Sequence, residues 1–116
     1  GGFFLGAISQ PAPVVANATG NVLHLYVSGF SQPSITINKG STLTLINDGN
    51  YHHSISNGQW VNGQPMITQE TGAPKVSHLD INTAGKSYSI GPFATAGTYH
   101  LLCSIHHGMM VTIVVQ

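Results

Sequence analysis

The sequence has 116 residues, of which 41% are hydrophobic and only 5% are charged, and its formal net charge is zero with histidine neutral. A chain of this length forms one core, so we expect residues 1–116 to be a single domain. A single cysteine excludes an intrachain disulfide. The scarcity of cationic side chains excludes a nucleic-acid-binding protein and a polybasic membrane-binding segment, because both need clustered Lys and Arg.

The N-terminal segment begins with an apolar run from Gly1 to Ile8. This run is much shorter than the roughly 20 residues that a membrane-spanning helix needs, and it lacks the positively charged start of a secretory signal. Two interpretations stay open for residues 1–20. They form an ordinary first strand, or they follow a removed signal or membrane anchor that would tie the protein to a membrane.

Strand signals dominate the rest of the sequence. Alternating or β-branched stretches predict strands at residues 22–27, 34–38, 42–46, 76–81, 87–90, 97–102 and 110–115, and another begins near 51–55. Residues 57–74 are polar and rich in Gly and Pro, which predicts a long loop with at most one short helical turn. Seven to eight short strands at this spacing predict an all-β fold, a Greek-key β-sandwich.

The candidate metal-binding residues lie between the last two predicted strands. There Cys103, His106 and Met109 follow a C-x2-H-x2-M spacing within one tight loop. A thiolate, an imidazole and a thioether form a soft donor set that favours copper over magnesium or calcium. A second histidine is available in residues 51–55, which contain His52 and His53. Two His, one Cys and a weak axial Met describe a blue-copper electron-transfer site.

Both halves of this pattern resemble the cupredoxins, the type 1 blue copper proteins. The first half is residues 34–47, a short turn and His53; the second is residues 97–99 followed by Cys103 and its loop. The loop length is similar to that of amicyanin and plastocyanin-like domains, and the pair His53–Ser54 is similar to that of rusticyanin. The resemblance implies a cupredoxin fold and one type 1 copper ion that cycles between Cu(I) and Cu(II).

The resemblance also implies four metal ligands, which are His53, Cys103, His106 and Met109. The spacing from Asn47 favours His53 over the adjacent His52. Met109 is favoured as the axial ligand, but Met110, which opens the last predicted strand, stays open as the alternative.

We also predict roles for residues that lie near the four predicted ligands in the sequence or the fold. As in relatives, the backbone N–H of Ser54 is expected to donate to the Cys103 sulfur. We expect Asn47 to tie the two ligand-bearing loops together and Trp60 to pack over the loop rather than to carry electrons. The remaining histidines in strand patterns are interpreted as surface or hydrogen-bonded residues: His24, His78 and His100.

The predicted function is the transfer of single electrons between redox protein partners that dock near His106. The docking face is expected to be small and apolar, formed by Ile105, Gly108, Met110 and Pro92. Because the net charge is zero, long-range electrostatic steering should be weak. We expect a monomer that is not an enzyme.

Two alternative functions stay open. The first is a small copper redox enzyme with an open copper position that acts on a small molecule such as nitric oxide, and the second is a copper-delivery or storage protein.

The sequence contains only three acidic side chains. Acid usually unfolds a protein by protonating its carboxylates, so few such groups are available here. We therefore expect an acid-tolerant protein located outside the cytoplasm, in a periplasm or on the outer face of the cell membrane, although the seven histidines, which charge below a pH of about 6.5, oppose acid tolerance.

Overall fold

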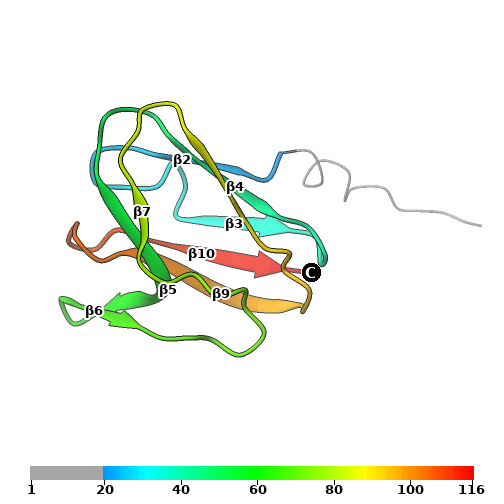
Figure 1. Cartoon of the computed structure of the whole chain (residues 1–116). Coiled ribbons are helices and arrows are strands. Elements are labelled where there is room, and N and C mark those ends of the chain that lie inside the picture. The colour runs from blue at the N-terminus through cyan, green and yellow to red at the C-terminus, as the bar shows by residue number, and fades with distance from the viewer. Residues whose placement is uncertain (1–19) are drawn as a thin grey trace, which may run out of the picture.

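The structure, a computed structural model, describes residues 20–116, which form nine strands in two facing sheets (Figure 1). The smaller sheet has the order β2 (Val22–Leu25), β4 (Leu43–Asn47) and β8 (Ser87–Ile90). The larger sheet has the order β3 (Ser34–Ile37), β10 (Met110–Val115), β9 (Gly97–Cys103), β5 (His53–Val61) and β6 (Gln64–Ile67), and β7 (Leu79–Ile81) also pairs with β5. Within this range no helix has the length and hydropathy that crossing a bilayer requires.

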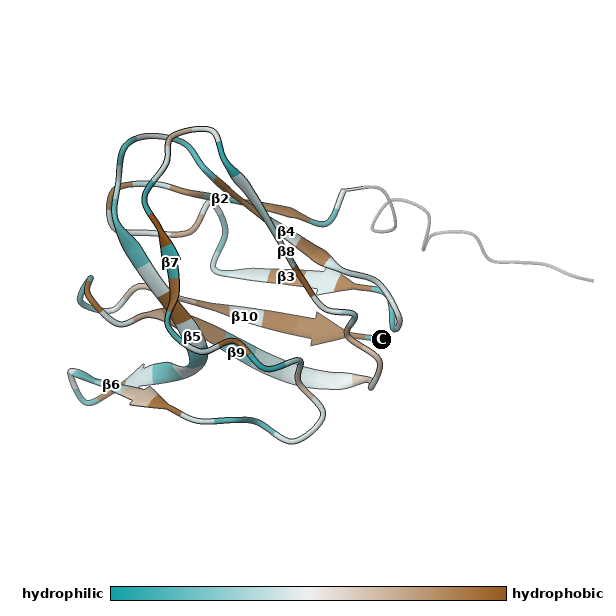
Figure 2. Cartoon of the chain, viewed as in Figure 1, coloured by the Kyte–Doolittle hydropathy of each residue, from teal (hydrophilic) through white to brown (hydrophobic). Residues whose placement is uncertain are grey.

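The core lies between the two sheets because the strands alternate buried and exposed side chains. In β4 the pattern runs buried, intermediate, buried, intermediate, buried, and β10 alternates in the same way. Successive side chains on a strand face opposite sides, so this alternation produces one apolar face per sheet. Figure 2 shows the hydrophobic residues concentrated on the strands. The fully buried core side chains include Leu23, Leu25, Ile37, Leu43, Leu45, Leu101 and Ile113.

The strand directions gather several loops at one end of the sandwich. Strands β2 and β4 run parallel and end there, β5 begins there, and β9 ends there before β10 returns antiparallel. Residues 26–33, 48–52 and 104–109 therefore share one end, which lies opposite the C-terminus (Figure 1). The C-terminal end is closed by a hydrogen bond from the Lys39 amide to the Gln116 carbonyl, 2.8 Å long.

The predicted sandwich is confirmed, but one predicted loop is wrong in its first half. Residues 57–61 continue β5 and pair with β6 in a hairpin. Its two-residue turn consists of Asn62 and Gly63, which both have positive φ (51° and 76°), as the favoured hairpin turn requires. At Gly58, with φ 131°, the backbone passes so close to β6 that a Cβ atom would lie 2.1 Å from the Met66 carbonyl oxygen.

The Gly and Pro residues in this segment favour a loop, and they obscure a local signal for a hairpin. An Asn-Gly pair between strand-forming residues is a strong hairpin signal, and Asn62–Gly63 is such a pair. The predicted strand at 76–81 is shortened to β7, and the other predicted strands agree to within about two residues. The predicted N-terminal strand lies outside the described residues.

Candidate metal centre

Three metal-binding side chains converge at the end of the sandwich where β9 stops. One donor atom from each of His53, Cys103 and His106 lies within 4.8 Å of the others. The Cys103 Sγ is 3.3 Å from the His106 Nδ1, and the centroids of the two imidazole rings are 5.0 Å apart. His53 and Cys103 are fully buried, whereas His106 is half-buried. The centre therefore lies inside the protein with one ring reaching toward solvent.

The buried imidazole of His53 lacks the partners that such a group normally has. Neither Nδ1 nor Nε2 of His53 has a hydrogen-bond partner, although burying a polar group without a partner is unfavourable. Burial lowers the pKa of the His53 imidazole below its ordinary value of 6.5, the nearby His106 lowers this pKa further, and the backbone of Tyr26 acts in the opposite direction. A neutral ring next to a thiol and a second imidazole presents free lone pairs, so these residues fit a soft metal ion as the missing partner.

The loop that carries Cys103 and His106 is closed by its own backbone. The Cys103 amide donates to the Met109 carbonyl (3.0 Å), and the Met109 amide donates to the His106 carbonyl (3.1 Å). Met109 is only 2% exposed, whereas its neighbour Met110 is 42% exposed. The backbone of Met109 is thus bonded to both predicted ligands of the loop.

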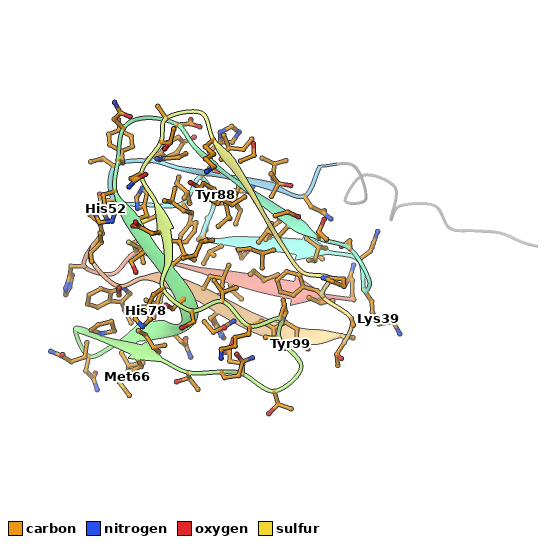
Figure 3. The ribbon with its side chains drawn as sticks, viewed as in Figure 1. Lys39, His52, Met66, His78, Tyr88 and Tyr99 are labelled. Carbon is orange, nitrogen blue, oxygen red and sulfur yellow. The ribbon has the colours of Figure 1, made fainter. Side chains whose placement is uncertain are left out.

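His52 and His53 are adjacent in sequence but separate in space. His53 is the first residue of β5 and faces the centre, whereas the exposed His52 pairs with Asp80 across 2.5 Å. Figure 3 shows His52 at the outer edge of the molecule. The structure brings His53 to Cys103 and His106, and it keeps His52 outside that group.

The expectation that Asn47 ties the two ligand-bearing loops is wrong. Its Nδ2 donates to the carbonyls of Tyr51 (2.9 Å) and Thr83 (3.5 Å), and its Oδ1 has no partner. The reason is that Asn47 ends β4 in the smaller sheet, whereas the Cys103 loop follows β9 in the larger one. The two ligand-bearing segments are joined by Ser54 instead, whose carbonyl accepts the Ser104 amide at 3.0 Å. Donation from the Ser54 N–H to the Cys103 sulfur stays a prediction.

Each of the three carboxylates in the sequence contacts a histidine. The pairs are His24–Asp48 (2.5 Å), His52–Asp80 (2.5 Å) and His100–Glu70 (2.6 Å). The interpretation of His24 and His100 as hydrogen-bonded residues is confirmed by these contacts. Carboxylates at the loop-bearing end are therefore already engaged by neighbouring histidines.

The apolar surface near the centre differs from the expected one in one residue. Ile105 (50% exposed) and Met110 (42% exposed) lie on or beside the ligand loop as expected. Pro92 does not belong to this surface, because its neighbour Phe93 bonds to Ser41 in the turn at the opposite, C-terminal end. Pairing of β8 with β4 carries the chain away from the centre before Pro92 is reached.

The fold and the cluster agree with the comparisons with known proteins. The family model for copper binding proteins of the plastocyanin/azurin family matches residues 24–116. This chain belongs to that family. The chain is 38% identical over 90 residues to plastocyanin from Scenedesmus fuscus, which covers 75% of this chain and 86% of that plastocyanin.

Solved structures of amicyanin also support the fold. Amicyanin from Paracoccus versutus superposes with a TM-score of 0.59 at 21% identity, covering 82% of this chain and 79% of amicyanin. An amicyanin variant in its reduced Cu(I) form gives a TM-score of 0.57 at 21% identity, covering 82% of this chain and 80% of that variant. The family and the donor set of thiol, two imidazoles and thioether together fit one copper ion of type 1.

Proposed function

We propose that the protein is a type 1 copper protein that carries single electrons between redox partner proteins. The observation that carries this proposal is the convergence of His53, Cys103 and His106 within 4.8 Å, inside a sandwich of the plastocyanin/azurin family. Copper, when bound, supplies one-electron chemistry between the +1 and +2 states. The residues of this chain supply its binding, its shielding from water and a path to the surface.

The four ligands in this proposal are His53, Cys103, His106 and Met109. His53 is favoured over His52 because it is buried and its two nitrogens have no other partner. Met109 is favoured over Met110 because it is buried and its backbone is bonded to the loop on both sides. The thiolate and the two imidazoles would bind copper most strongly, and the thioether would be the weaker fourth donor.

Electron transfer fits this arrangement better than catalysis. The ligands come from two paired strands and a loop closed by hydrogen bonds, so their positions depend little on the charge of the bound ion. Met109 is 2% exposed, which supports a closed centre without an open position for a small substrate. In the described part of the chain, no observation favours the small redox enzyme or the storage protein.

We place the docking surface for redox partners around His106. The loops at this end expose large apolar side chains, which are Tyr26, Val27, Tyr51, Ile105 and Met110. Lys39 lies at the far end from His52 (Figure 3), and the carboxylates near the centre are paired with histidines. Apolar contact rather than charge would then dominate docking, so electron transfer to partners should depend weakly on salt. The monomeric state and the location outside the cytoplasm stay predictions.

The decisive experiment is a titration of the metal-free protein with Cu(II), followed by visible absorption and voltammetry. We expect an intense visible band at one equivalent of copper and a reversible one-electron couple. The Cys103→Ser variant replaces the thiolate by a hydroxyl of similar size, and it should lose the intense band. An intense colour retained by this variant, or none in the parent protein, would overturn the proposal.

A further inference from the structure

Trp60 of the β5–β6 hairpin contacts the ligand loop in three ways. Its indole Nε1 donates to the Cys103 carbonyl at 3.0 Å. Its backbone amide lies 3.4 Å from the Met110 Sδ. Its ring faces His107 with centroids 5.1 Å apart and planes tilted by 54°. One residue of the hairpin therefore contacts the loop at its beginning, middle and end.

These contacts fall at or beside each proposed ligand of the loop. Cys103 is itself a proposed ligand, His107 follows His106, and Met110 follows Met109. The loop already has two internal hydrogen bonds, which join Cys103 to Met109 and Met109 to His106. Trp60 adds external contacts to the same short loop, so the loop is held from within and from the hairpin.

The hairpin places Trp60 independently of the loop that carries Cys103, His106 and Met109. Trp60 pairs with Pro65 of β6, and the arm is closed by the Asn62–Gly63 turn. The same turn reaches the loop, because a Cβ on Gly63 would lie 3.7 Å from the His107 Cε1. The indole is thus carried by a paired arm of the larger sheet rather than by the ligand loop.

We propose that Trp60 is a positioning residue that fixes the ligand loop and raises the reduction potential of the centre. This inference rests on the proposed copper function. The indole N–H directs the positive end of its dipole at the carbonyl of Cys103, the residue whose sulfur would bind copper. A positive dipole end stabilises the electron-rich, reduced state relative to the oxidised state. The contact would therefore favour reduction while restraining the loop.

The test compares Trp60→Phe with Met66→Ala in the full chain. The Phe variant keeps an aromatic ring against His107 but loses the N–H donor. Met66 is on the outer strand of the same hairpin and is 51% exposed, so its variant is the matched control (Figure 3). We measure the reduction potential, the Cu(II) spectrum and, in metal-free protein, hydrogen exchange of the Cys103 and Met109 amides.

We expect the potential to fall and the Cu(II) spectrum to shift in Trp60→Phe but not in Met66→Ala. Exchange of the Cys103 and Met109 amides should accelerate roughly fivefold to tenfold, as for the loss of one hydrogen bond. Amides of β2 and β4 should be unaffected. A purely structural role would accelerate exchange without moving the potential, and that result would overturn the proposal.

The outcomes separate this inference from the proposed function. A parent protein without the intense visible band would refute the copper function, and the inference that rests on it. A blue parent protein with an unchanged Trp60→Phe variant would refute only the role of Trp60. If Trp60→Phe does not fold, the parent protein still provides a test, because Trp60 is the single tryptophan. Its indole N–H resonance should exchange slowly and shift when Cu(I) binds, and a rapidly exchanging, unshifted resonance would overturn the proposal.

Discussion

The backbone amide of Ser104 donates to the carbonyl of Ser54 across 3.0 Å. Each of these serines directly follows a proposed ligand, His53 in β5 and Cys103 in β9. The register of the two strands pairs Ile55 with Cys103 beside this bond. The relative position of these two proposed ligands is therefore set by the pairing of β5 with β9.

Substitutions of His52 and His53 should show which of these adjacent histidines binds copper. His53→Ala removes a buried ring of the cluster, so we expect copper affinity to fall by more than about a hundredfold, the upper range for loss of an outer-shell partner. His52→Ala removes only an exposed ring paired with Asp80 and should change affinity little. Competition titrations with a copper chelator measure both. A larger loss in His52→Ala would show that the wrong histidine is assigned.

The two adjacent methionines should differ in their effect on the reduction potential. A thioether donates to Cu(II) more effectively than a hydrocarbon does, so Met109→Leu should raise the potential while the visible band persists. Met110→Leu replaces a side chain that is 42% exposed and should cause a smaller shift. Voltammetry on both variants checks this order. The reverse order would identify Met110 as the axial residue.

The metal-free protein should lose stability as the pH falls below about 6.5, the ordinary pKa of histidine. Because burial and His106 lower the pKa of His53, the unfolded chain takes up a proton here before the folded protein does. The free energy of unfolding then decreases with falling pH, by at most about 1.4 kcal/mol per pH unit for this group, until the folded His53 is itself protonated.

Urea unfolding of the metal-free protein at several pH values measures this slope. His53→Asn removes the titrating ring and keeps a polar side chain, so it should flatten the dependence relative to the parent protein. Replacement of His52 by Asn provides a control at an exposed ring of the same turn. Equal slopes in the parent protein and His53→Asn would refute this assignment.

The hairpin that carries Trp60 should depend on Gly58. In Gly58→Ala the new Cβ would lie 2.1 Å from the Met66 carbonyl oxygen at a φ of 131°, so the two strands must separate. We expect a loss of about 3 kcal/mol in unfolding free energy. At Gly29 no atom lies within 4 Å of the added Cβ, and Gly29→Ala should change stability by less than about 0.5 kcal/mol. Thermal unfolding of both variants compares them directly.

Some features of this protein follow from short stretches of sequence. Alternation in residues 42–46 and 110–115 predicts β4 and β10, because the period of a strand is local. The spacing of Cys103, His106 and Met109 predicts a soft metal site, because the three donors share one loop. The Asn62–Gly63 pair is an equally local signal for a hairpin turn, although the Gly and Pro residues around it favour a loop.

Other features depend on contacts between distant parts of the chain. Which of two adjacent histidines joins Cys103, and which end of the sandwich holds Pro92, depend on how distant strands pair. The contact between Trp60 and the Cys103 carbonyl joins residues 43 positions apart. The strands and the donor set can be predicted from sequence alone, since both depend on neighbours along the chain. The arrangement around the centre required the packed sheets, because it depends on residues that meet only after folding.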